Sequence, residues 1–448
     1  MGETLARTFA EEAINAGVAH LGAGYRLGHF DPVDTTEIYL DRIARFDGRT
    51  GCYVALDAEG ALAAAQASRA RFAHAEPLSA LDGVPIAIKA NILVSGLPCH
   101  AGIGAYRHRL AEEDASCVSR LRRAGVIILG MVNLHEACAG ATTNNEAFGR
   151  THNPWRHGFT PAGSSGGSAA AVTAGLAAAA LGTDTAGSVR LPAAFTGSYG
   201  FKPSLEAISI QGAVPLASAL DHVGIHARSV EDCRLLWHGL TRHRVYAPSG
   251  PLDRKPRLAT LDLERWQPLN EDIVRAFQRS VARAKSAGMT VDTIDIHPID
   301  LPVVMSLVGS ELSALYGTDL RRASDSFSIE LREMVEASSA FSASDVVAGH
   351  QSRRRISDGI RDALENYDAL LTPSAGIRPH AFEEASDPRI AMFTLLGNFS
   401  GLPAMAFPAG LGSDGMPASN QLLAWDEETA LTLADMLAEE VGAPPHYG

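Results

Sequence analysis

The spacing of apolar positions predicts helices in the first part of the chain. In TEIYLDRIARF, apolar side chains recur close to the helical period, namely Ile38, Leu40, Ile43 and Phe46. Asp34 or Thr35 can cap this helix, because both side chains accept from backbone N–H groups of a first turn. An alanine-rich second helix follows from Ala61 to Ala73. We therefore expect residues 1–75 to form a helical N-terminal part.

Short apolar stretches predict strands between later helices. Val84, Ile86 and Ile88 alternate in GVPIAIKANI, which is typical of a short buried strand. Farther along, Asp114 is a candidate helix cap, and the apolar residues 126–129 follow the glycine that ends this helix.

The same order of elements recurs near residue 280. Asn270 can cap a helix that continues through Ala287, and residues 289–296 then alternate as a strand. Two further strands are expected at 367–376 and, after a loop, within 398–410. Helices that alternate with short apolar strands predict an α/β fold built on a mixed sheet.

Residues 160–190 combine glycine, serine and alanine in an unusual density. Two Gly/Ser clusters flank a stretch of small residues, which we interpret as a single buried helix with a site at each end. Residues 298–350 carry a weaker helical pattern. Because neither a repeat nor a clear linker interrupts the chain, we expect a single domain over residues 1–448, with 76–240 as its core.

Composition narrows the class of protein. The chain has 448 residues, 46% of them apolar, and a formal net charge of −13, which disfavours a nucleic-acid partner. The 5 cysteines are scattered, so a disulfide framework or a zinc site is not expected. The N-terminus has no apolar signal core, and Ala169–Leu181 is too short to span a membrane. We expect a soluble cytoplasmic protein without membrane attachment, metal or cofactor.

Three side chains suggest nucleophilic catalysis. Lys89 ends the predicted strand 84–89, Ser164 lies in AGSSGGS, and Ser188 lies in GTDTAGSVR. A serine needs a base within hydrogen-bond reach and donors directed at the developing oxyanion. Burial disfavours a charged lysine, so Lys89 could accept a proton that Ser164 relays from Ser188. A tight turn before Ser188 and a helix over 189–195 behind it could direct backbone N–H groups at an oxyanion.

Three segments in this order resemble the amidase signature family. They are GVPIAIKANI, the long run AGSSGGSAAAVTAGLAAAALGTDTAGSVRLPAAFTGSYGFKPS, and NFSGLPAMAFPAG, which follows the pattern NxxGLPAxxFPAG. The resemblance implies an α/β amidase signature fold, with a central mixed, twisted β-sheet covered on both faces by helices. It also implies a hydrolase of carbon–nitrogen bonds that works through an acyl-enzyme.

The resemblance assigns roles residue by residue. It implies a triad of Ser188 as nucleophile, Ser164 as the cis-serine and Lys89 as base. The oxyanion hole maps to the backbone of four consecutive residues, Thr185, Ala186, Gly187 and Ser188. The supporting positions are Ser165, Asp184 and Arg190.

Four positions depart from the family pattern. Alanines stand at Ala162 and Ala186, where the family usually has glycine, so the backbone at Ala186 must tolerate a Cβ. Ala90 replaces the aspartate that commonly follows the lysine. Leu191 replaces a glutamine that is typical of the transamidation subunits for charged tRNA, which argues against an amidotransferase-type role.

Other functions use the same residues differently. Residues 163–167 match G-x-S-x-G, which would make Ser165 the nucleophile of an α/β-hydrolase-like esterase, although the preceding segment is typical of a loop. The Gly/Ser cluster lacks the lysine of a phosphate-binding loop. His135-Glu136 begins like a zinc-binding HExxH, but Ala139 stands where the second histidine belongs. A catalytically inactive binding protein is a further alternative.

The substrate is expected to be a small, partly apolar amide, anilide or carbamate (urethane), with carbamate or ester side activity. This partner follows from the reduced polarity beside Lys89 and from the resemblance of TTNNEAFGRTHNPW to members that act on small aryl or indole amides. The region 298–350 and the loops near 130–155 are expected to wall the pocket. Its candidate lining residues are Leu134, Ala137, Thr142, Asn144, Phe148, Tyr316, Phe327 and Phe341. A homodimer is consistent with the family, in which many members are dimers.

Overall fold

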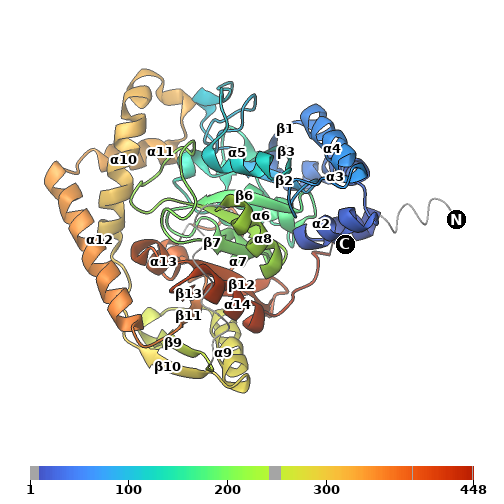
Figure 1. Cartoon of the computed structure of the whole chain (residues 1–448). Coiled ribbons are helices and arrows are strands. Elements are labelled where there is room, and N and C mark those ends of the chain that lie inside the picture. The colour runs from blue at the N-terminus through green and yellow to red at the C-terminus, as the bar shows by residue number, and fades with distance from the viewer. Residues whose placement is uncertain (1–9, 242–253, 386, 446, 448) are drawn as a thin grey trace.

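The computed structural model describes residues 10–241, 254–385, 387–445 and 447 (Figure 1). Residues 1–9 of the predicted helical N-terminal part lie outside this description. Among the described residues, no helix combines the length and apolar character that crossing a membrane requires. All five cysteines are free and buried.

A large mixed sheet forms the centre of the described chain. In spatial order its strands are β1 (Tyr53–Leu56), β3 (Ile127–Val132), β2 (Pro85–Lys89), β6 (Ala179–Asp184), β8 (His222–Ala227), β7 (Tyr199–Lys202), β12 (Ala404–Leu411), β13 (Pro417–Ala424), β11 (Ala369–Pro373), β9 (Arg257–Leu261) and β10 (Thr290–Ile294). β2 pairs in parallel with β3 and β6, and β9 with β10 and β11, whereas the remaining neighbours are antiparallel. The predicted mixed α/β sheet is therefore confirmed.

Helices cover both faces of this sheet (Figure 1). Their bounds are α2 (Val18–Leu27), α3 (Pro32–Thr50), α4 (Ala58–Ala73), α5 (Ser116–Arg123), α6 (Gly166–Thr173), α7 (Arg190–Thr196), α8 (Val230–Leu240), α9 (Glu271–Ser286), α10 (Leu301–Arg322), α11 (Ile329–Ser338), α12 (Ala343–Leu364), α13 (Thr394–Ser400) and α14 (Glu427–Leu437). The helical prediction for 298–350 is confirmed by α10, α11 and the first part of α12. These three helices pack on one another along one side of the molecule (Figure 1).

Two of the predicted helix caps are wrong. α3 begins at Pro32, and Asp31 caps it by accepting from the N–H groups of Val33 at 2.7 Å and Asp34 at 3.2 Å. A proline suits the first helical position, because its missing N–H would have no partner there. α5 is flanked by Ala115, which makes no side-chain cap.

Asp114, the predicted cap of α5, instead faces a loop. Its carboxylate accepts from the N–H of Ser95 at 2.8 Å and pairs with Arg122 at 3.0 Å. The third predicted cap is confirmed, since Asn270 accepts from the N–H of Asp272 at 2.8 Å at the start of α9.

The small-residue segment is one helix followed by one strand, which corrects the prediction of a single helix. α6 ends near Gly175, whose φ of 68° lies in the left-handed region that stops helices. The chain then enters the sheet as β6, every residue of which is buried. Small side chains are needed because a Cβ on Gly182 would lie 2.8 Å from the hydroxyl of Ser165.

The third motif also differs from its prediction. Residues 398–400 complete helix α13 rather than forming a loop, and β12 begins at Ala404 after the left-handed Gly401. The predicted strands at 367–376 and 289–296 are confirmed by β11 and β10.

The buried strand β3 allows a test of the core. Leu129→Ala removes a fully buried side chain and is expected to lower the free energy of unfolding by about 2–5 kcal/mol, because the cavity cannot fully collapse. Urea denaturation measures this change. The control Leu27→Ala alters a side chain that is 70% exposed and should stay within about 0.5 kcal/mol of the wild type. Equal losses in the two variants would contradict the assigned core.

Candidate active site

Lys89 and Ser164 meet in the interior at the end of β2. The Nζ of Lys89 lies 2.8 Å from the Oγ of Ser164 and 2.8 Å from the Oγ1 of Thr183 on β6. The parallel pairing of β2 with β6 holds Lys89 and Thr183 close together. Lys89 and Ser164 are completely buried, as the apolar neighbours of Lys89 in the sequence predict. The peptide bond between Gly163 and Ser164 is cis.

Ser188 lies next to the loop that carries Ser164. Its carbonyl accepts from the N–H of Ser165 at 3.2 Å, which joins the two serine-bearing segments through their backbones. The side chain is at the edge of the buried region, with 9% of its surface exposed. In the described part of the chain, the Ser188 hydroxyl makes no hydrogen bond, so it is free to turn toward a reacting group.

Burial sets the protonation of Lys89. Removal from water disfavours the ammonium and lowers the pKa of Lys89, although nearby Cys138, Asp184 and Asp221 act in the opposite direction. His226 on β8 is also fully buried, and burial lowers its pKa to about 3, so its imidazole is neutral. The site therefore holds a lysine whose proton is weakly bound, beside hydroxyls rather than directly paired carboxylates.

Asp184 organises the backbone in front of Ser188. Its carboxylate accepts from the N–H groups of Gly187 at 2.8 Å and Val189 at 3.1 Å. Among the predicted oxyanion donors, the Gly187 N–H is bonded to Asp184 in this structure. The N–H groups of Ala186 and Ser188 find no acceptor among the described residues. Ala186 is not in the left-handed region, as the Cβ at this position requires.

Ala162, the other alanine at a position where the family usually has glycine, differs from Ala186 in its backbone conformation. Ala162 has a φ of 62°, in the left-handed region that favours glycine. Its side chain is buried in a small apolar cluster with Leu191 and Phe195. The methyl group thus packs against the helix that follows the nucleophile loop, in a conformation that carries some backbone strain.

Arg190 pairs with Asp184 without any contact with water. The Nη2 of Arg190 lies 2.9 Å from Oδ1 of Asp184, and both side chains have no exposed surface. Asn398 on α13 donates to the same carboxylate at 2.8 Å. Burial alone would raise the pKa of Asp184, but the charge and hydrogen bonds of Arg190 hold it well below its ordinary range. This pair fixes the turn on which Ser188 lies.

Ser165 supports the strand rather than facing a substrate. It is completely buried, its hydroxyl donates to the carbonyl of Thr183 at 3.1 Å, and it flanks the start of α6. A nucleophile elbow requires a strand directly before the serine. The described residues 151–165 contain none, so the esterase alternative with Ser165 as nucleophile lacks its structural basis.

Residues of the HExxH-like segment connect the core to helix α11. His135 lies 3.3 Å from the carboxylate of Glu330, and Glu136 accepts from the N–H of Ser328 at 3.1 Å. On α10, the Glu311 carboxylate accepts from both the N–H and the hydroxyl of Ser218, at 2.7 and 2.6 Å. These contacts hold α10 and the start of α11 against the loops around the candidate site.

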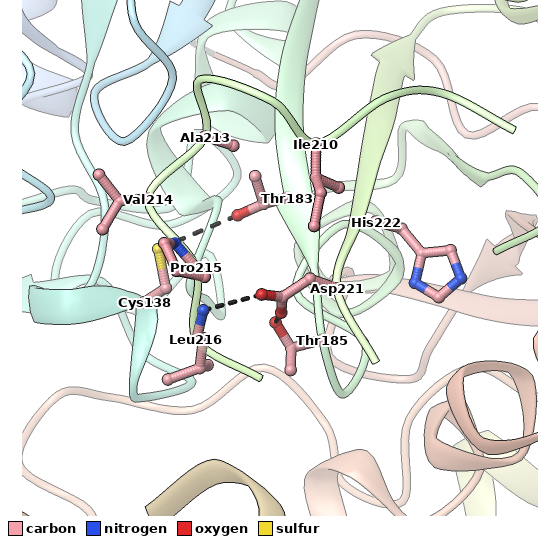
Figure 2. A pocket seen from close by; sticks show the side chains of 10 residues that line it. All are labelled: Cys138, Thr183, Thr185, Ile210, Ala213, Val214, Pro215, Leu216, Asp221 and His222. Atoms are coloured by element: carbon pink, nitrogen blue, oxygen red, sulfur yellow. Dashed lines mark hydrogen bonds between the residues drawn. The ribbon is translucent and has the colours of Figure 1, made fainter. Parts of the chain in front are cut away.

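A small cavity adjoins Thr183 and Thr185 (Figure 2). Figure 2 shows Asp221 beside it, where its carboxylate accepts from the hydroxyl of Thr185 at 2.5 Å and from the N–H of Leu216 at 2.8 Å. The volume of the cavity is about 10 Å³, enough for one water molecule. The lining residues are Cys138, Thr183, Thr185, Ile210, Ala213, Val214, Pro215, Leu216, Asp221 and His222.

None of the eight predicted pocket residues lines this cavity. Tyr316 and Phe327 are buried between the helices and Tyr106, and Phe148 stacks on His100 at 3.7 Å. Sequence reasoning missed Thr183, Asp221 and the loop 210–216, because no spacing relates them to the serines. The one sequence signal for Thr183 is its position directly before Asp184, a predicted site residue.

The buried ion pair yields a stability prediction. Asp184→Asn leaves the Arg190 charge buried and unpaired, which is expected to cost about 3–5 kcal/mol of unfolding free energy at pH 7. Because the pKa of Asp184 is lowered in the folded state, its contribution is present above the ordinary value of 3.8 and is lost as the pH falls below it. The gap between wild type and variant should therefore stay constant from pH 7 down to about pH 5 and narrow as the pH falls below 3.8 in urea titrations. Asp41→Asn, at an exposed position, should show no such gap.

Comparison with known proteins identifies relatives over nearly the whole chain. The model of the family described as Amidase matches residues 34–431. The chain is 32% identical to a Glutamyl-tRNA(Gln) amidotransferase subunit from Anaeromyxobacter dehalogenans (strain 2CP-C), covering 98% of this chain and 99% of that protein. It is 33% identical to the protein of the same name from Roseiflexus sp. (strain RS-1), covering 91% and 93%.

Solved structures agree with this placement. A crystal structure described as an amidase superposes with a TM-score of 0.87 at 29% identity, covering 94% of this chain and 99% of that one. A peptide amidase in complex with the competitive inhibitor chymostatin superposes with a TM-score of 0.83 at 25% identity, covering 96% and 99%. The family model, the sequence relatives and the fold together show that the chain belongs to the amidase family, whose signature motifs it carries.

Proposed function

We propose that this protein hydrolyses amide bonds through an acyl-enzyme, with Ser188 as nucleophile, Ser164 as proton relay and Lys89 as base. The observation that carries this proposal is the fully buried amine of Lys89, 2.8 Å from the hydroxyl of Ser164. A lysine in water is protonated at neutral pH and cannot act as a base. Burial among hydroxyls supports the neutral form that general-base catalysis needs.

The proton passes from Ser188 through Ser164 to Lys89 once the Ser188 hydroxyl turns toward Ser164, which already lies 2.8 Å from the amine of Lys89. Ser164 can donate its proton to the lone pair of neutral Lys89 while it accepts the proton of Ser188, because a hydroxyl donates and accepts at once. The freed oxygen of Ser188 attacks the substrate carbonyl and forms a tetrahedral oxyanion. The proton then returns along the same path to the leaving nitrogen, which releases the amine. Water repeats the sequence on the acyl-enzyme and regenerates Ser188.

The oxyanion is stabilised by backbone amides of the turn before α7. The N–H groups of Ala186 and Ser188 are available for this role, and Thr185 lies at the start of the same turn. Asp184 and Arg190 support the turn from behind, so its donors are fixed before the reaction begins. Such preorganised donors each contribute roughly 2.7–4 kcal/mol to transition-state stabilisation in acyl transfer.

The proposed substrate is a small, partly apolar amide, anilide or carbamate. Support comes from Ala90, which is buried beside Lys89 and provides no carboxylate to bind a charged group. Cys138 and Val214 add apolar surface to the adjoining cavity. A small acyl group suits these surroundings better than a charged peptide, since burying an unpaired charge is costly.

An amidotransferase-type role is the second candidate. The curated relatives at 32–33% identity favour it, because they are named as subunits of a Glutamyl-tRNA(Gln) amidotransferase. Such a role would use the same serines to release ammonia from an amide donor. The net charge of −13 and Leu191 after Arg190 argue against it in this chain.

The first test removes the base. Lys89→Ala should lower kcat/KM for an amide by about 10³-fold or more, because Ser164 loses its proton acceptor. For the wild type, kcat/KM should fall as the pH drops through the lowered pKa of Lys89, which lies below the ordinary value of 10.5. The control Lys285→Ala changes an exposed lysine and should keep the wild-type rate. Retained turnover in Lys89→Ala would refute the mechanism.

A substrate panel separates the two candidates. The wild type, assayed alone, should turn over p-nitroanilides, aryl carbamates or small aryl amides with kcat/KM at least tenfold above that for glutamine. Steady-state kinetics on purified protein measures this ratio. If glutamine were the best substrate, or if only charged peptides were cleaved, the proposed substrate class would be wrong while the triad could stand.

A further inference from the structure

We propose that Asn91 is a positioning residue that keeps Lys89 neutral by presenting an amide donor where an acceptor would stabilise the ammonium. The inference rests on the proposed function, in which the neutral amine of Lys89 is the base. Asn91 is two residues beyond Lys89, directly after β2, and is completely buried. Its amide reaches Lys89 through Thr183, to which both side chains are hydrogen-bonded.

The geometry brings two nitrogen donors to one oxygen. The Nδ2 of Asn91 donates to the Oγ1 of Thr183 at 3.1 Å, and the Nζ of Lys89 donates to the same atom at 2.8 Å. Asn91 also donates to the carbonyl of Val214 at 3.4 Å, which fixes the orientation of the amide. The positive ends of two N–H dipoles therefore converge beside the amine of Lys89.

Hydrogen-bond valence limits what Thr183 offers to Lys89. A hydroxyl accepts two hydrogen bonds and donates one, so Lys89 and Asn91 together fill both acceptor positions of Thr183. The Thr183 proton is left to face the thiol of Cys138, whose sulfur lies 3.9 Å away. The sulfur of Cys138 also faces Lys89, so two hydroxyls and a thiol surround the amine. None of these groups supplies the directly paired negative charge that would favour the ammonium.

Four other titratable groups lie around Lys89 and influence its protonation. They are Cys138 from the turn 136–138, Asp184 on β6, Asp221 from the loop before β8 and His226 on β8. The charge of Asp184 is paired with Arg190, and Asp221 is bonded to Thr185 and to backbone amides. Both carboxylates are engaged elsewhere, so a new carboxylate beside Thr183 would act directly on Lys89.

The oxygen of Asn91 takes no part in this network. Its Oδ1 is buried and accepts from none of the described residues. The amide therefore contributes its nitrogen alone, which is the end that carries donors. Replacing that nitrogen by oxygen changes the sign of the interaction without changing the size of the side chain.

The experiment compares Asn91→Asp with the wild type. The rate at which an alkyl fluorophosphonate labels Ser188 is measured across pH, with the site of labelling found by peptide mass analysis. The acidic limb of the wild-type profile reports deprotonation of Lys89. A carboxylate within about 4–6 Å is expected to shift the pH midpoint of this limb upward by about 1–3 pH units. The labelling rate just above the wild-type limb should therefore fall about tenfold or more.

Asn420 provides a matched control. It is also completely buried, its Nδ2 donates to one backbone carbonyl (Ala276, 3.1 Å) and one hydroxyl (Ser280, 2.8 Å), and its Oδ1 has no partner among the described residues. Asn420→Asp should lower the thermal midpoint about as much as Asn91→Asp without moving the limb. A limb that moved equally in both variants would overturn the proposal.

Asn91→Leu separates the donor from the shape of the side chain. It removes the donor without adding a carboxylate, so the pH midpoint of the limb should rise, but by less than in Asn91→Asp. An unmoved midpoint in Asn91→Leu would overturn the proposal even if Asn91→Asp failed to fold. Wild-type protein that is not labelled at Ser188 would overturn the proposed function and this inference together. Wild-type labelling with an unmoved limb in folded Asn91→Asp would overturn this inference alone.

Discussion

A single amine without water around it sets the requirements for the rest of the candidate site. Lys89 ends a strand whose every residue is buried, and its pKa falls because the surrounding protein cannot solvate an ammonium. Hydroxyl groups at 2.8 Å satisfy the amine without supplying a charge. A directly paired carboxylate at this place would favour the protonated form of Lys89. The proposed chemistry thus depends on how the sheet excludes both water and countercharge.

The same interior also holds a true ion pair. Asp184 and Arg190 are both fully buried, and they neutralise each other while they fix the backbone in front of Ser188. Paired charges suit a structural role, since their protonation does not change near neutral pH. The unpaired Lys89 suits a catalytic role because its proton is weakly held. β6 provides residues to both arrangements and keeps them apart.

A small cavity lies beside the candidate site, at Thr183, and accommodates one water molecule. Neither Lys89 nor the two serines of the candidate triad line it. Ser188 instead keeps 9% of its surface exposed at the edge of the buried region. Helices α10 and α11 are held against the nearby loops by hydrogen bonds from Ser218 to Glu311 and from Ser328 to Glu136.

The sequence by itself determined the family, the mixed α/β sheet and the burial of Lys89, because these follow from contiguous motifs and from alternating apolar residues. It also singled out Ser164 and Ser188 as candidates. It misplaced the caps at Asp34 and Asp114, since several acidic or hydroxyl residues near each helix start could serve and tertiary contacts chose among them. Only the tertiary structure decided which atoms meet across the sheet. The bonds from Lys89 and Asn91 to Thr183, and from the Gly187 N–H to Asp184, depend on strand register and turn geometry, which no local pattern of residues encodes.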